Sequence, residues 1–188
     1  MTPTSFFARI CALVLLVVLS PLLIALWLIC LVAHGRPVMF RQFRAGKDTK
    51  PFRLLKFRTM CNSRDEDGNL LPDEQRVTAV GTFLRRTRID ELPGLVNVVR
   101  GDMAFVGPRP LLPETIEELG ERGRKRCAVK PGLTGWSQVN GNTLLTLDQK
   151  VALDLWYIDH RGALLDLRIL ALTLFVVVAG ERIRSGTA

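Results

Sequence analysis

The sequence has few residues of the types that build metal clusters or disulfide frameworks. Its 188 residues include four cysteines and two histidines. No two cysteines form a CxxC pair and His34 lies far from His160, so a zinc site has little support. The cysteines are scattered singly, which indicates no disulfide framework and agrees with a reducing compartment. They are Cys11, Cys30, Cys61 and Cys127.

The sequence also lacks internal repeats, low-complexity tracts and the length for a second domain. After one membrane segment is subtracted, 188 residues leave a single domain of ordinary size with one core. An enzyme that transfers phospholipid alcohols would need several membrane spans and a repeated aspartate motif. Neither is present in the sequence.

Acidic residues are outnumbered, at 18 Asp and Glu against 26 Lys and Arg, which gives a net charge of +8 and a pI near 9.9. On charge alone, nucleic acid, an anionic membrane face and an anionic substrate fit equally well. Many basic residues directly follow an apolar run, where each one near an anionic leaflet contributes about 1 kcal/mol. They are Arg36, Arg41, Arg44, Lys47, Lys50, Arg53, Lys56 and Arg58. This position makes nucleic acid the weaker interpretation.

One long apolar run without a charge covers residues 10–33. It is long enough to cross the hydrocarbon core of a membrane, which requires about 20 helical residues. Ser20-Pro21 near its middle predicts a sharp kink, because Pro21 has no N–H and its ring crowds the carbonyl of Val17. The run fits a kinked crossing or a re-entrant helix-break-helix hairpin, both with the C-terminal side in the cytoplasm. A cleaved signal peptide is a weaker third interpretation, because the apolar stretch is too long.

The remaining sequence predicts an α/β fold, mainly α with a small β-hairpin. Residues 38–43 and 52–57 have the pattern of short strands joined by a turn-rich segment, and the acidic stretch 62–74 is typical of a loop. Residues 169–179 are apolar but too short to span a membrane, so we expect them to lie against the membrane or the core. Helices are further predicted at 90–100, 113–125 and 147–158, and a glycine-rich loop at 130–141.

The adjacent carboxylates of Asp90 and Glu91 lie in one of the most cationic stretches of the chain, residues 84–93. A carboxylate attacks a phosphoryl group only after the phosphate charge is neutralised, usually by arginines and a divalent metal. Asp90 also has the position of a helix N-cap, beside which a phosphate could dock. The alternative is that Asp90 is only a cap and Glu91 only a first-turn acid.

Arg109 stands between Pro108 and Pro110, shortly after the carboxylate pair. The prolines restrict the backbone on both sides of the arginine and so limit the entropy that it loses when it engages a ligand. An arginine matches a phosphate in a bidentate way. A rigid turn with a solvated arginine is the alternative.

Six motifs spread over nearly the whole chain carry a family resemblance. They are Pro37-Val38-Met39-Phe40-Arg41-Gln42, Lys56-Phe57-Arg58-Thr59-Met60, Arg85-Arg86-Thr87-Arg88-Ile89-Asp90-Glu91-Leu92-Pro93, Gly101-Asp102-Met103, Val106-Gly107-Pro108-Arg109-Pro110 and Pro131-Gly132-Leu133-Thr134-Gly135-Trp136. In this order they resemble the bacterial sugar transferase family, the monotopic phosphoglycosyl transferases. The chain resembles the minimal catalytic domain of this family, without the extra membrane helices of longer members.

The resemblance implies transfer of a sugar 1-phosphate from a UDP-sugar to a polyprenyl phosphate such as undecaprenyl phosphate, with release of UMP. This is the first membrane step of surface glycan assembly, such as that of an exopolysaccharide. It further implies that Asp90 is a nucleophile that forms a covalent phosphosugar intermediate and contacts Mg²⁺, with Glu91 assisting activation of the acceptor phosphate. By the same resemblance, Lys56, Arg85 and Arg109 face phosphate.

The resemblance also favours the re-entrant hairpin, broken at Ser20 and Pro21, over a crossing, since a hairpin keeps both substrates on one face. The implied organisation is a monotopic membrane hairpin at 1–35, a cytoplasmic catalytic domain at 36–163 and an apolar interfacial or core-packing helix with its tail at 164–188. It implies amphipathic interfacial helices on the cytoplasmic face of the bacterial inner membrane. A homodimer is left open.

Two positions depart from the pattern of many relatives, which have a small polar residue where Arg88 stands and an arginine where Asn142 stands. The competing function is a non-enzymatic, membrane-tethered interaction module held by its basic patch. The sequence does not specify the sugar, the polyprenol or the pathway.

Overall fold

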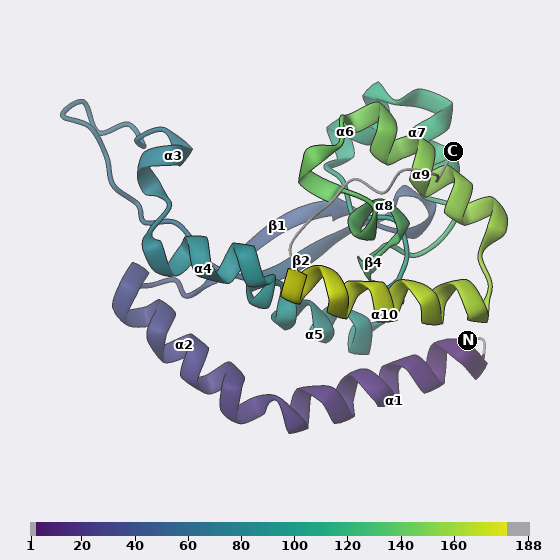
Figure 1. Ribbon diagram of the computed structural model, residues 1–188. Helices are drawn as coiled ribbons and strands as arrows, with labels where there is room; N and C mark the ends of the chain where they lie inside the picture. The colour runs from purple at the N-terminus through teal and green to yellow at the C-terminus, as the bar shows by residue number, and fades with distance from the viewer. Residues whose placement is uncertain (1–2, 180–188) are drawn as a thin grey trace.

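The computed structural model describes residues 3–179 and is mainly helical with two small sheets (Figure 1). In chain order the elements, with η for 3₁₀ helices, are α1 (Pro3–Val18), α2 (Ser20–His34), β1 (Met39–Ala45), η1 (Lys47–Thr49), β2 (Pro51–Phe57), α3 (Asp73–Arg76), α4 (Ala79–Thr87), η2 (Ile89–Gly94), α5 (Leu95–Arg100), β3 (Ala104–Val106), α6 (Pro113–Glu118), α7 (Gly120–Arg126), β4 (Gly132–Thr134), α8 (Trp136–Val139), η3 (Asn142–Leu144), α9 (Leu147–His160) and α10 (Ala163–Ala179). The expected C-terminal tail, 180–188, lies outside the described residues.

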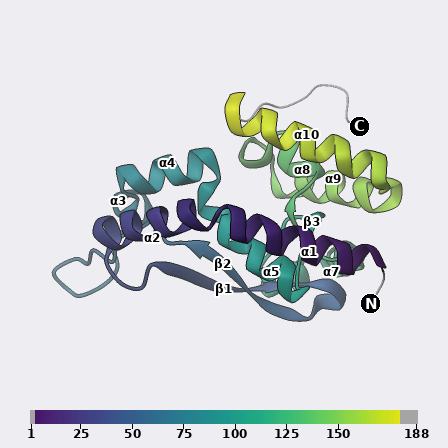
Figure 2. The ribbon, with the colours of Figure 1, turned by 90° about the horizontal axis from the view of Figure 1, so that it is seen from below.

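The apolar run forms two helices, α1 and α2, which meet at Leu19 with a bend of 63°. Pro21 lies in the first turn of the second helix, and the Ser20 hydroxyl donates to the carbonyl of Val17 at 2.7 Å. In the described part of the chain no single helix has the length and apolar composition to cross a membrane, and the bent pair meets that test only when taken together. Seen from below, α1 lies over α5, and α2 continues across the molecule toward α4 (Figure 2).

Strands β1 and β2 form the expected antiparallel hairpin, with a register from Met39 opposite Phe57 to Ala45 opposite Pro51. Behind it, the buried side chain of Asn97 in α5 accepts from the Leu55 N–H at 3.1 Å and donates to the Arg53 carbonyl at 2.8 Å. These two bonds fix β2 relative to the segment that carries the carboxylate pair.

Three of the basic residues that follow the apolar run do not face outward, which corrects the expectation that all of them serve an anionic leaflet. Lys56 and Arg44 line a cavity described below. Arg58 is 7% exposed and donates to the backbone carbonyls of His34, Gly35 and Arg36. Arg58 therefore binds the carbonyls that are left free where α2 ends.

The single helix expected at 90–100 is wrong, because the structure has η2 followed by α5. Pro93 lies inside η2, where it supplies no N–H to an α-helical ladder. Arg88 holds the cap position in a left-handed conformation (φ 56°), with no side-chain cap hydrogen bond. Asp90 is therefore not the N-cap, so the prediction that a phosphate docks beside a capping carboxylate is wrong.

A second sheet, the parallel pair β3 and β4, was not expected from the sequence. It forms because glycines let two backbones approach closely: a Cβ on Gly107 would lie 2.5 Å from the Lys130 carbonyl oxygen. The N–H of Gly107 donates to the Thr134 carbonyl at 2.9 Å, and the N–H of Gly132 donates to that of Pro108 at 3.0 Å. This pairing anchors the backbone that precedes Arg109.

The later helices agree with the sequence in part. α9 matches the helix expected at 147–158, whereas the helix expected at 113–125 is divided at Leu119 into α6 and α7. α10 buries Ile169 and Val176 against the core, which confirms the core contact expected for this apolar stretch, and it leaves Leu174 72% exposed. Exposed apolar side chains on α1, α2 and α10 make a surface suited to lipid or to another protein.

Candidate active site

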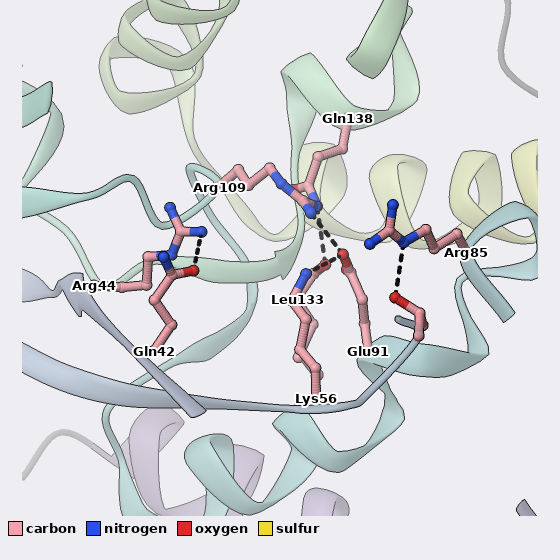
Figure 3. Close-up of polar contacts among 9 residues, drawn as sticks. Gln42, Arg44, Lys56, Arg85, Glu91, Arg109, Leu133 and Gln138 are labelled. Atoms are coloured by element: carbon pink, nitrogen blue, oxygen red, sulfur yellow. Dashed lines mark hydrogen bonds and ion pairs between the residues drawn. The ribbon is translucent and has the colours of Figure 1, made fainter. Parts of the chain in front are cut away.

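All five residues predicted to do chemistry or to face phosphate line one cavity of 590 Å³. They come from separate parts of the fold and are Lys56 in β2, Arg85 in α4, Asp90 and Glu91 in η2, and Arg109 after β3. Figure 3 shows Lys56 and Arg109 pointing toward Glu91, with Arg85 beside them. In the sequence, only the family resemblance grouped these five residues. The fold brings all of them to one cavity.

Glu91 is held by two cations that share one of its oxygens. Lys56 Nζ lies 2.9 Å from Glu91 Oε1 and Arg109 Nη2 lies 2.7 Å from the same atom. Burial by itself would raise the pKa of Glu91, but Arg109 and Lys56 outweigh it and lower the pKa to about 2. Glu91 is therefore an ionised anchor for two cations at neutral pH.

Asp90 has the opposite electrostatic environment, although it is the adjacent residue. Its side chain is buried, at 8% exposed. Burial and then the charge of Glu91 raise its pKa to about 6, against the opposing effect of Lys56, Arg109 and Arg85. A raised pKa makes a carboxylate a better nucleophile, and divergent pKa values in neighbouring carboxylates are typical of separate roles in one active site.

Arg85 and Arg109 are each fixed by a second contact. Arg85 Nε donates to the hydroxyl of the buried Thr59 at 2.8 Å. The backbone carbonyl of Arg109 accepts from Arg126 Nη2. Arg126 in turn pairs with Asp154 at 2.7 Å, and the hydroxyl of Ser137 donates to the other Asp154 oxygen at 2.7 Å. The backbone of Arg109 is therefore attached to a buried ion pair between α7 and α9.

The buried pair gives a stability prediction with a matched control. Asp154→Ala leaves Arg126 buried without its carboxylate, so we expect a loss of about 3–5 kcal/mol in the free energy of unfolding. Asp159→Ala removes an equivalent α7–α9 pair, with Lys125, in which both side chains are about half exposed, and we expect a loss below about 1 kcal/mol. Chemical unfolding of both variants in detergent measures the difference. Equal losses of unfolding free energy in the two variants would mean that the buried pair stabilises the fold no more than the exposed one.

Sequence reasoning missed further residues of the cavity. Arg44 Nη2 donates to Gln42 Oε1 at 2.6 Å, and both side chains line the cavity. Gln42 lay in the strand predicted at 38–43 and Arg44 one residue beyond it, and their spacing of two was an available signal, since such residues share a face once the strand extends to Ala45. Asp73 and Arg76 come from α3, inside and just beyond the stretch expected to be a loop, and carried no such signal.

Both positions that depart from the family pattern, Arg88 and Asn142, line the same cavity. Each has a left-handed backbone, with φ of 56° and 42°. They are therefore placed where they can contact a substrate.

The carboxylates of the cavity suit Mg²⁺ only in part. Among residues 3–179, no group of three or more His, Cys, Asp or Glu side chains could hold a metal ion. Mg²⁺ is commonly bound by one or two carboxylates together with substrate phosphates and water. Asp90 suits such a site, because it lines the cavity, whereas Glu91 is occupied by Lys56 and Arg109.

The cavity combines features that are typical of an enzyme site for an anionic substrate: one carboxylate of raised pKa, a second one clamped by cations, and further arginines. A family model described as "Bacterial sugar transferase" matches residues 3–180. The chain belongs to the bacterial sugar transferase family, as its motifs predicted, and is a family enzyme rather than a non-enzymatic tether.

Similar proteins support this family. The uncharacterized sugar transferase EpsL of Bacillus subtilis is 49% identical over 150 residues, which cover 80% of this chain and 74% of EpsL. The UDP-glucose:undecaprenyl-phosphate glucose-1-phosphate transferase of Escherichia coli is 40% identical, over 87% of this chain and 38% of its own. The undecaprenyl-phosphate galactose phosphotransferase of Salmonella typhimurium is 35% identical, over 92% of this chain and 40% of its own length. The chain thus spans less than half of the latter two relatives.

Proposed function

We propose that this enzyme transfers a sugar 1-phosphate from a UDP-sugar to undecaprenyl phosphate and releases UMP. The observation that carries the proposal is the carboxylate pair, Asp90 with a raised pKa beside the clamped Glu91, in a cavity lined by cations. Relatives named for this reaction, which differ in their sugar, support the substrate classes. The particular sugar and the glycan pathway are left to experiment.

In the first half of the reaction, a carboxylate oxygen of Asp90 attacks the phosphorus that bears the sugar. The bond from that phosphorus to the bridging oxygen breaks, its electron pair leaves with UMP, and the sugar phosphate stays on Asp90 as an acyl phosphate. Arg109, Lys56 and Arg85 lie close enough to Asp90 to act on its charge, and they would stabilise the phosphoryl oxygens as negative charge shifts during attack.

In the second half, a phosphate oxygen of the acceptor attacks the same phosphorus. The acyl phosphate bond breaks, Asp90 recovers its carboxylate, and the product is a polyprenyl diphosphosugar. Because the pKa of Glu91 is about 2, we assign it a positioning role: it holds Lys56 and Arg109 where they orient the acceptor phosphate. Glu91 thereby assists the acceptor without taking its proton.

Asp90 is the residue that would hold Mg²⁺, together with phosphate oxygens of the donor. When bound, this ion neutralises phosphate charge and favours departure of UMP. We expect excess chelator to lower turnover at least about tenfold, and added Mg²⁺ to restore it. Full activity in excess chelator, with UMP release as the readout, would exclude dependence on the metal.

The bent pair α1–α2 would insert into the cytoplasmic face of the inner membrane as a re-entrant hairpin. The lipid acceptor and the soluble donor would then meet on one side, with 36–163 as the catalytic part and 164–188 as an interfacial helix and tail. The length and apolar composition of the pair and its 63° bend support this arrangement.

The test is UMP release by detergent-solubilised protein from a panel of UDP-sugars with undecaprenyl phosphate and Mg²⁺. We expect multiple turnovers with one sugar or a few, and only when the acceptor is present. Without acceptor, release should stop at about one UMP per enzyme, because Asp90 stays occupied. No release from any UDP-sugar by folded protein would refute the proposed reaction.

A further inference from the structure

A second cavity, of 330 Å³, lies between the bend of the α1–α2 pair, the start of α5 and α10. Its walls are mainly aliphatic and aromatic. They include Leu15, Leu19, Leu95, Phe105, Leu170 and Val177. A concave, apolar site of this size is at the lower end of the range of about 300–1,000 Å³ for ligand pockets.

The few polar groups in this wall are largely engaged with one another or with the backbone. The hydroxyls of Thr134 and Thr173 lie 2.7 Å apart, and Thr173 also donates to the Ile169 carbonyl at 2.8 Å. The Gln138 amide nitrogen donates to the Leu133 carbonyl at 3.0 Å, whereas its buried Oε1 has no hydrogen-bond partner within the described residues. The wall therefore presents mainly carbon to an occupant, which suits a hydrocarbon chain.

The apolar cavity adjoins the catalytic one. Arg88 and Glu91 line both cavities, at the turn from α4 into η2. One side of this turn faces the cationic cavity that holds Asp90, and the other faces the aliphatic wall. A molecule with a phosphate at one end and a hydrocarbon chain at the other would fit across the turn.

The opposite side of the apolar cavity is bounded by helices whose outer faces are also apolar. On α1, Leu13 is 52% exposed and Val17 66%, and on α10 Leu174 is 72% exposed. If these faces meet lipid, a chain can pass from the bilayer into the cavity without crossing a polar surface. The cavity is too small for a long polyprenyl chain, so most of the chain would stay in the bilayer.

We propose that the cavity between α1 and α10 binds the first isoprene units of the polyprenyl acceptor, with the acceptor phosphate at the turn that contains Arg88 and Glu91. This inference rests on the proposed function and adds to it the site of the lipid chain. Burial of each CH₂ group of the chain favours binding, so the site selects acceptors by the part of the chain nearest the phosphate.

Four tryptophan variants test the cavity from opposite walls. Leu15→Trp on α1 and Val177→Trp on α10 fill it, whereas Leu13→Trp and Leu174→Trp place the same ring on the outer faces of the same helices. The measurements are the burst of UMP without acceptor and the dependence of turnover on undecaprenyl phosphate concentration. We expect the two filling variants to keep the burst and to lose about tenfold or more in kcat/KM for the acceptor, while the two outer variants stay within about twofold of the native protein.

A second measurement uses the native protein and does not depend on any variant folding. Prenyl phosphates of two, three, four and eleven isoprene units are compared as acceptors. We expect kcat/KM to rise steeply over the first units and then level off when the cavity is full. Equal kcat/KM for two and eleven units, or equal acceptor dependence in filling and outer variants, would overturn the inference. Absence of the UMP burst in the native protein would instead refute the proposed function.

Discussion

Asp90→Asn should lower UMP release at least about 10³-fold while the protein stays folded and membrane-associated. The amide has nearly the shape of the carboxylate but cannot form the acyl phosphate, and loss of a nucleophile usually removes most of the rate enhancement. Because Asp90 is buried beside Glu91, removal of its charge also relieves a like-charge contact, so we expect no loss of stability. The first measurement is steady-state UMP release with the preferred UDP-sugar.

A matched control and a direct observation sharpen this result. Asp159→Asn makes the same chemical change at an exposed residue of α9, paired with Lys125, and should leave turnover within about twofold. Mass spectrometry of native protein incubated with donor alone should detect a sugar phosphate adduct on the peptide that contains Asp90. Normal turnover by Asp90→Asn would remove Asp90 from the role of nucleophile.

Glu91→Gln should slow turnover by about 10²–10³-fold through a different cause. The variant leaves Lys56 and Arg109 without the charge that holds both of them at one oxygen. Two cations released from this contact move apart, and the phosphate loses a prepared binding geometry. The measurement is kcat and KM for donor and acceptor separately, since loss of positioning should lower kcat more than it raises the KM of the donor.

Glu118→Gln, at an exposed residue of α6, serves as the control for Glu91→Gln. We expect it to leave both kinetic constants unchanged. If Glu91→Gln turned over normally, the clamp of Lys56 and Arg109 would be a structural contact without a part in the reaction.

The β-hairpin and the kink at Ser20-Pro21 were predictable because each depends on local chemistry. Alternating residues and a turn-rich connection define the hairpin, and a proline defines the kink. The members of the cavity were identified by motif, since Lys56 and Arg109 are far apart in sequence and meet only through Glu91. Their assigned roles remain predictions.

Other features depend on tertiary contacts that leave no periodic signal. Strands of three residues, such as β3 and β4, are too short to show alternation, and their pairing depends on glycines far apart in the chain. The helix expected at 90–100 is divided at Pro93. The sequence did not reveal this division, because a proline in the first turn of a single helix would also have been tolerated. The inward position of Arg58 depends on carbonyls of α2, which no charge pattern reveals.

The contact of Arg58 with the end of α2 links the apolar helix pair to the strand that carries Lys56. Arg58 binds three successive carbonyls where the apolar pair ends, and it follows Lys56 by two positions. A tilt of α2 would therefore shift Arg58 and, two residues away, the lysine that pairs with Glu91. In the proposed membrane arrangement, a change in bilayer thickness that alters this tilt would act as a mechanical input to the catalytic centre.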